Sequence, residues 1–192
     1  MAKTNQGILG AFTGTIGPVT GYIRDGQNIL RTSRSNVNYK HTPSRIEQLE
    51  KIKICNSFTK AFSGTGFFNK AFPAYGSNGS GYNRATSALT SQALTGPDIQ
   101  LSYQKVLISK GKLPGAENAL AVAAENGTIY FSFTNNSDTG TASAFDKVIM
   151  VAYAEVLQQA VFSLNAGLRK NGEAVLQAGM FKEYTVETWI GF

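Results

Sequence analysis

The sequence predicts a mainly β protein with some helix: a C-terminal immunoglobulin- or fibronectin-like antiparallel β-sandwich, preceded by a β-hairpin and two helices. Composition favours this class, because the 192 residues include 20 glycines, 8 tyrosines and 12 phenylalanines among many Ser, Thr and Asn, as in β-rich chains with many turns. From residue 98 onward, short alternating segments are separated by turn residues, which is typical of an antiparallel sandwich.

The N-terminal region is rich in glycine, and these glycines are the predicted assembly segment: Gly7, Gly10, Gly14, Gly17 and Gly21. Strands are predicted at 15–24 and 27–31, around an Asp25-Gly26 turn that supplies the positive φ of a tight hairpin. A phosphate-binding loop would need Lys followed by Ser or Thr after its last glycine, and the 14–17 stretch lacks them. Tight turns or close backbone approach therefore explain these glycines better.

A long helix should follow, because Thr42-Pro43 indicates an N-cap and a first-turn proline. The helix is expected to run to about residue 62, with one buried stripe formed by Ile46, Leu49, Ile52, Cys55, Phe58 and Phe62. The aromatic, glycine-rich residues 63–81 should pack against it. A second helix at about 83–94 is closed by Gly96-Pro97, which places the domain boundary between residues 96 and 97.

The C-terminal half should contain seven strands, predicted at 100–109, 119–123, 128–134, 147–155, 159–163, 173–177 and 184–192. The loop at 135–140 offers oxygen atoms that could bind calcium. It has one carboxylate and no EF-hand spacing, so an ordinary polar loop is the better interpretation.

Charge is concentrated in the first 60 residues, which carry nine cations and three anions and therefore the whole net charge of +6. Four of these cations could contact nucleic-acid phosphates or an acidic protein surface, with Tyr39 offering a stacking face: Arg31, Arg34, Lys40 and Arg45. No recognition helix, zinc finger or RNP-type motif accompanies them, so nucleic-acid binding would be nonspecific. Simple solvation of a connecting segment is the alternative.

Nothing in the sequence indicates an enzyme, and no catalytic residue, metal site, cofactor or small-molecule substrate is predicted. His41 and Cys55 are the only residues of their types. A His-dependent triad would have to be assembled by chance around His41 from distant Ser and Asp, and one His with one Cys cannot build a recurring zinc site. No apolar run approaches the roughly eighteen residues that span a bilayer, and the N-terminus lacks the continuous apolar core of a Sec signal peptide. We expect a cytoplasmic protein or one assembled into a virion-like particle, without a membrane partner.

Several motifs resemble a family of uncharacterised domains that is common in Bacteroidetes. They are the spaced glycines, Arg31 and Arg34, the Thr42-Pro43 helix start, and the stretches 101–106, 131–136 and 146–149. The basic segment before the helix is also similar, more weakly, to phage virion structural proteins. The stretch 184–192 resembles the sixth strand of fibronectin type III domains, with Tyr184 near the tyrosine-corner position.

This resemblance implies one more strand, which the sequence does not supply after Phe192. The predicted last strand would then leave an open sheet edge, along which Val186, Thr188, Ile190 and Phe192 alternate with Thr185, Glu187 and Trp189. Unpaired backbone groups beside an apolar core are costly. The edge could be covered by the chain's own N-terminal segment, by that of a neighbouring copy, or by another protein.

We therefore expect a non-enzymatic structural protein that self-associates into a fibre, tube, shell or virion-like particle. Residues 1–96 would be the assembly module and residues 97–192 the sandwich, with segment 7–34 engaging a neighbouring copy by strand addition. The alternative is a nonspecific nucleic-acid-binding protein that uses the basic segment 31–45. A carbohydrate-binding adhesin is suggested only by the fold class, which does not determine function.

Overall fold

The computed structural model describes residues 2–4, 10–24, 26–33, 40–76, 79–96 and 99–192. The chain forms two compact units, Met1–Thr42 and Pro43–Phe192, and each is described by itself. The boundary between the units differs from the one that the sequence suggested at 96/97. The helices after residue 43 share a hydrophobic core with the sandwich, so they belong to the second unit.

The first unit is a four-stranded antiparallel sheet in the order β1-β2-β3-β4. Its strands are β1 (Lys3–Thr4), β2 (Phe12–Ile16), β3 (Val19–Arg24) and β4 (Gln27–Thr32). The expected hairpin around Gly26 is present as β3 and β4. The single strand expected at 15–24 is instead interrupted by a turn, because Gly17 adopts a left-handed conformation with φ of 53° and pairs β2 with β3.

Three helices open the second unit: α1 (Pro43–Lys60), α2 (Phe67–Ala71) and α3 (Gly81–Gln92). Helix α1 begins at the proline as the sequence predicts. Its expected apolar stripe is buried only in the C-terminal half, where Cys55 and Phe58 are nearly inaccessible. The N-terminal part of the stripe is exposed: Ile46, Leu49 and Ile52 are 46%, 47% and 42% accessible.

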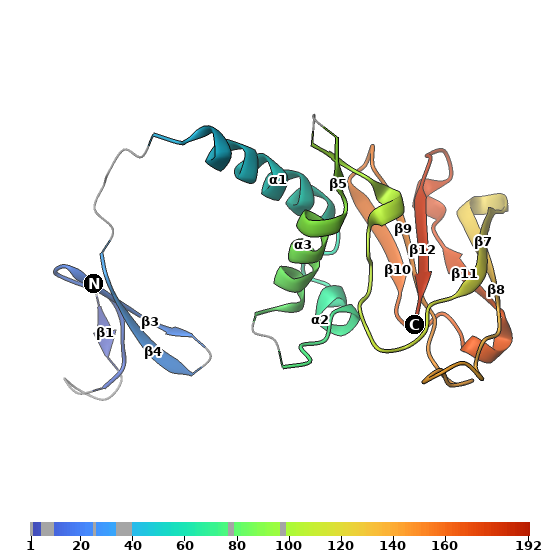
Figure 1. Cartoon of the computed structure of the whole chain (residues 1–192), viewed down its shortest axis with the longest axis horizontal. Helices are drawn as coiled ribbons and strands as arrows, with labels where there is room; N and C mark the ends of the chain where they lie inside the picture. Colours follow the sequence, from blue (N-terminus) through green and yellow to red (C-terminus); the bar gives the residue numbers. More distant parts are fainter. Residues whose placement is uncertain (1, 5–9, 25, 34–39, 77–78, 97–98) are drawn as a thin grey trace. The chain divides into compact units, whose positions relative to one another are not determined.

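The sandwich consists of two three-stranded antiparallel sheets (Figure 1). One has the order β11-β8-β7, formed by β7 (Glu117–Ala123), β8 (Thr128–Thr134) and β11 (Glu173–Gln177). The other has the order β10-β9-β12, formed by β9 (Ile149–Ala154), β10 (Gln159–Ser163) and β12 (Glu187–Gly191). These strands match six of the predicted ones, with ends that differ by a few residues.

The strand predicted at 100–109 is different. Only its beginning is β-structure, as β6 (Gln100–Leu101) in a small hairpin with β5 (Leu94–Thr95). A 3-10 turn at Tyr103–Lys105 follows, and then an irregular segment leads to β7.

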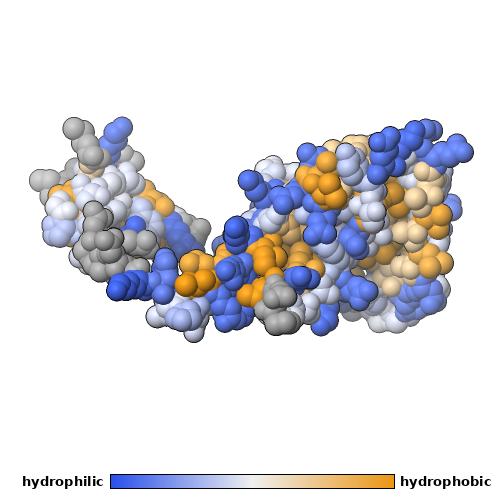
Figure 2. Space-filling view, turned by 90° about the horizontal axis from the view of Figure 1, so that it is seen from above, coloured by the Kyte–Doolittle hydropathy of each residue, from blue (hydrophilic) through white to orange (hydrophobic). Residues whose placement is uncertain are grey.

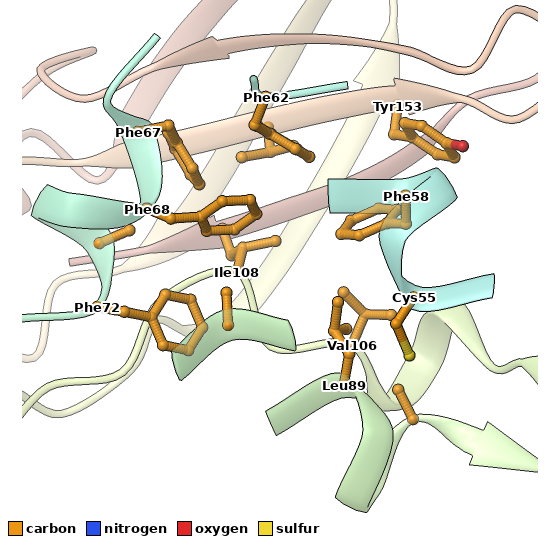
Figure 3. Close-up of a cluster of buried hydrophobic side chains, with 14 residues drawn as sticks. Cys55, Phe58, Phe62, Phe67, Phe68, Phe72, Leu89, Val106, Ile108 and Tyr153 are labelled. Atoms are coloured by element: carbon orange, nitrogen blue, oxygen red, sulfur yellow. The ribbon is translucent and has the colours of Figure 1, made fainter. Parts of the chain in front are cut away.

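The second unit has three layers: the helices, the β10-β9-β12 sheet and the β11-β8-β7 sheet. An aromatic cluster fills the space between the helices and the β10-β9-β12 sheet, where the ring centroid of Phe58 lies 4.9 Å from that of Tyr153 and 5.5 Å from that of Phe62 (Figure 3). A second cluster fills the space between the two sheets. Strand β9 is buried on both faces, because Val151 packs toward the helices and Met150 toward the other sheet.

Candidate functional site, the open flank of the sandwich

Strand β12 has one unpaired edge. It pairs with β9 on one side, and on its other side no strand of the described residues is hydrogen-bonded to it. Ile190 and the flanking Val186 and Phe192 pack into the core between the sheets, and Thr188 shares their side by alternation. Trp189 faces the helices. In an immunoglobulin-type sandwich, a seventh strand lies at this edge.

The irregular segment 106–115 borders β12 without extending the sheet. Together with residues 189–192 it lines a groove of about 340 Å³. The indole Nε1 of Trp189 donates a hydrogen bond of 3.2 Å to the Tyr103 carbonyl, and a Cβ on Gly191 would lie 3.0 Å from Ser109 Oγ. Val106 and Ile108 are buried in the helix-side cluster, so the segment belongs to the helix layer and leaves the backbone edge of β12 unpaired.

Strand β7 is the second part of this site, because all seven of its residues are exposed. Ala121 lies opposite Phe131 and Ala123 opposite Ile129, and both partners are buried core residues. The two alanine side chains therefore point to the inner side of the sandwich, where they are exposed. We call the outer edge of β12 and the inner side of β7 the open flank.

The strand order explains why these two parts belong together. Strand β10 lies beside β11 at one end of the sandwich, which leaves β12 and β7 at the other end. A strand added beside β12 would lie over the inner side of β7. Figure 2 shows hydrophobic side chains, in orange and tan, on the surface at the end of the molecule where β7 and β8 lie.

A buried arginine packs against the C-terminal end of β12, at the open flank. Arg169 is completely inaccessible and forms an ion pair of 3.1 Å with Asp146. It also donates a hydrogen bond of 2.9 Å to the Pro114 carbonyl and another to Asn136 Oδ1. Its guanidinium carbon lies 3.5 Å from the ring centroid of Phe192, so this ring is held in place at the end of β12.

The N-terminal end of β12 is acidic on the face that points toward the helices. Burial, followed by a hydrogen bond to Glu155 and the charges of Glu155 and Glu187, raises the pKa of Tyr103 well above its ordinary value. These two carboxylates therefore lie close to one phenol. Neither forms an ion pair with another residue in the described part of the chain. Glu155 and Tyr103 also line a cavity of about 590 Å³ between α1, β6 and the end of β9.

The first unit presents an apolar and a polar face. The strand registers place five apolar side chains on one face, namely Phe12, Ile16, Val19, Ile23 and Leu30. Ile16, Ile23 and Leu30 remain 54%, 49% and 54% exposed. The ring of Phe12 lies over Gly21, where a Cβ would meet it at 2.8 Å.

The polar face of this sheet is held by side-chain contacts between neighbouring strands. Thr15 and Thr20 share a hydrogen bond of 3.1 Å. The guanidinium of Arg31 lies 5.6 Å from the ring centroid of Tyr22. Arg31 is therefore fixed on the face opposite to Leu30.

Of the predicted assembly glycines, Gly14 and Gly21 are paired within the sheet and Gly17 forms its turn. Gly10 lies just before β2, and Gly7 lies outside the described residues. Of the predicted basic contacts, Arg31 and the exposed Lys40 belong to the first unit, and Arg45 lies exposed in the first turn of α1. Arg34 lies outside the described residues.

The remaining candidate residues have structural positions. Cys55 is fully buried, and burial raises the pKa of its thiol. His41 is exposed just before α1, and Tyr184 is 42% exposed before β12 begins. In the described part of the chain, no group of three His, Cys, Asp or Glu side chains could hold a metal ion, and no helix there has the length and apolar character needed to cross a membrane.

Asn136, in the polar loop weighed as a calcium site, is buried and donates hydrogen bonds to the Gly115 carbonyl and to Glu117, at 3.0 and 3.1 Å. With Arg169, it ties this loop to the segment that leads into β7. Sequence reasoning missed this network, because neither residue carries a local signal of burial.

No curated protein and no solved structure gives a significant match. A family model, described as a family of unknown function (DUF6266), matches residues 11–192. Because this match covers β2, β3 and β4 of the N-terminal sheet and the complete second unit, the chain belongs to this family of unknown function.

Proposed function

We propose that this chain is a non-enzymatic structural protein whose copies self-associate head to tail, each completing the sandwich of the next by strand addition. The observation that carries the proposal is the open flank: among the described residues, no strand pairs with the outer edge of β12, and the inner side of β7 is exposed there. Unpaired backbone donors and acceptors at a sheet edge readily pair with a strand from another chain.

The first unit supports the same conclusion, because it buries almost nothing by itself. Gly21 is the only buried residue among those described in Met1–Thr42. A small sheet with an exposed apolar face is unstable unless that face packs against another surface. The protein thus contains a sheet that needs a partner surface and a sandwich that needs a strand.

An exchange of this kind joins two different surfaces, one donor and one acceptor. Such heterologous contacts close into rings or continue as helical filaments, depending on the rotation between copies. A fibre, tube, shell or virion-like particle is therefore the kind of assembly that the proposal implies.

Two variants of the full-length chain test whether the open flank is covered in the assembly. Ala121→Lys places a charge on the inner side of β7, where it is tolerated in a single copy because Ala121 is exposed. Covering this lysine with a donor strand would bury an unpaired charge, which is strongly unfavourable. The matched control, Val122→Lys, introduces the same charge one residue later on the outer face of β7.

Mass photometry and light scattering of the wild type should show particles larger than one chain that grow with concentration. Ala121→Lys should shift the population to single chains, whereas Val122→Lys should leave it unchanged. Circular dichroism checks that both variants fold. Single chains of the wild type at every concentration, or equal assembly of all three proteins, would refute the proposal.

A further inference from the structure

We propose that β4 of a second copy is the strand that fills the open flank, running antiparallel to β12 with Arg31 opposite Glu187. This inference rests on the proposed function and specifies its donor, register and facing side chains. It follows from the edges, the faces and the charges of the two strands.

Strand β4 is available for such pairing. It is the last strand of the N-terminal sheet and pairs only with β3 among the described residues. Its six residues match the five of β12 in length. Strand β1, at the other edge of the sheet, has only two residues. The innermost strands, β2 and β3, could pair with a new partner only if the sheet opened.

One antiparallel register satisfies the side-chain pattern of both strands. If Arg31 is opposite Glu187, then Leu30 is opposite Thr188, and Ile29 opposite Trp189. Asn28 and Gln27 then meet Ile190 and Gly191, so β12 is paired over its whole length. In a parallel arrangement with Arg31 opposite Glu187, β4 could pair with only one further residue of β12, because β4 ends at Thr32.

The faces of the two sheets agree in this register. Leu30 belongs to the apolar face of the N-terminal sheet, and Thr188 lies on the interior side of β12. The apolar face would therefore turn toward the sandwich interior. Strand β4 would then lie over the uncovered alanines of β7, Ala121 and Ala123. Strand β3 would continue the apolar face beside it, so that both apolar surfaces become buried.

The charges agree as well. Arg31 stands on the polar face, against the ring of Tyr22. Glu187 is exposed and points to the helix side of β12, where Glu155 is also close to Tyr103. The register brings the arginine to this acidic end, on the same side of the combined sheet. Cross-strand pairs of opposite charge stabilise a sheet, and like charges destabilise it.

Charge reversal in full-length chains tests the pairing. Arg31→Glu and Glu187→Arg each replace an attraction by a repulsion and should each raise the dissociation constant of the assembly about tenfold, which corresponds to about 1.4 kcal/mol. The double variant should regain most of the wild-type affinity. An equal mixture of the two single variants should also assemble, because every donor then finds an acceptor of opposite charge.

Lys60→Glu and Glu173→Arg are matched controls, since both residues are exposed and lie away from the open flank. They should leave the dissociation constant unchanged. If Ala121→Lys blocks assembly but the reversals at Arg31 and Glu187 have no effect, β4 is not the donor, although the proposed function stands. Weakening by both single variants without recovery in the double variant would also overturn the pairing. A wild type that never assembles would refute both proposals.

Discussion

Replacing Arg169 with alanine should be among the most destabilising single changes in the sandwich. The side chain is inaccessible to solvent and joins four separated parts of the chain through Asp146, Asn136, Pro114 and Phe192. Alanine removes every one of these contacts at once. It leaves a carboxylate, an amide oxygen and a carbonyl with fewer partners, in a site that water reaches poorly.

The magnitude follows from the carboxylate that is left behind. The side chain of Asp146 is 13% exposed, and removing one partner of a buried ion pair typically costs about 3–5 kcal/mol. A domain has only about 5–15 kcal/mol of stability in total. The variant should therefore unfold at a much lower urea concentration than the wild type. The slope of its unfolding free energy against urea concentration should be similar to that of the wild type.

Equilibrium unfolding in urea, followed by the fluorescence of Trp189, measures this loss. Lys170→Ala is the matched control, because this neighbouring cation is exposed and its ammonium lies 5.1 Å from the ring centroid of Phe145. Its cost should stay within about 0.5 kcal/mol. A loss below about 1 kcal/mol for Arg169→Ala would show that the network does not hold the end of β12.

Three further predictions concern other parts of the chain. Gly81→Ala should lower the free energy of unfolding by about 1–3 kcal/mol through overpacking, because its Cβ would lie 2.1 Å from the Phe68 carbonyl oxygen. Gly115→Ala is the control and should be neutral, because its Cβ would have no atom within 4 Å. Equal unfolding midpoints of the two variants would contradict this prediction. The free energy of unfolding should fall as pH rises above about 10, since the raised pKa of Tyr103 lets only the unfolded chain ionise there, and Tyr103→Phe should flatten that fall; parallel pH curves would argue against it. Finally, fluorescence anisotropy at about 50 mM salt should show no binding to DNA or RNA, whereas binding that weakens steeply with salt would favour the alternative function of the basic segment.

Local patterns predicted the secondary structure well. The start of α1 at Pro43 and six strands of the sandwich follow from capping residues and alternation, which act over a few residues. The turn at Gly17 was missed, because β-branched neighbours favour a continuous strand and only the positive φ of this glycine shows the break.

Tertiary features could not be predicted in the same way. The apolar spacing of α1 indicates one stripe. It does not reveal that α3 and β9 cover only the part of this stripe that follows Ile52. The unit boundary at Thr42 and Pro43 arises because aromatic residues from the helices and from β9 and β10 form one cluster. The exposed inner side of β7 likewise depends on which strand lies above it.

Hydrogen–deuterium exchange at low and high protein concentration tests most directly whether assembly covers the open flank. The amides of β12 and β7 should become protected as particles form. Ala121→Lys should abolish this protection, while the amides of the buried β9 stay protected throughout. Growth of particles without added protection at β12 and β7 would contradict the central claim, because the copies would then be joined through another surface.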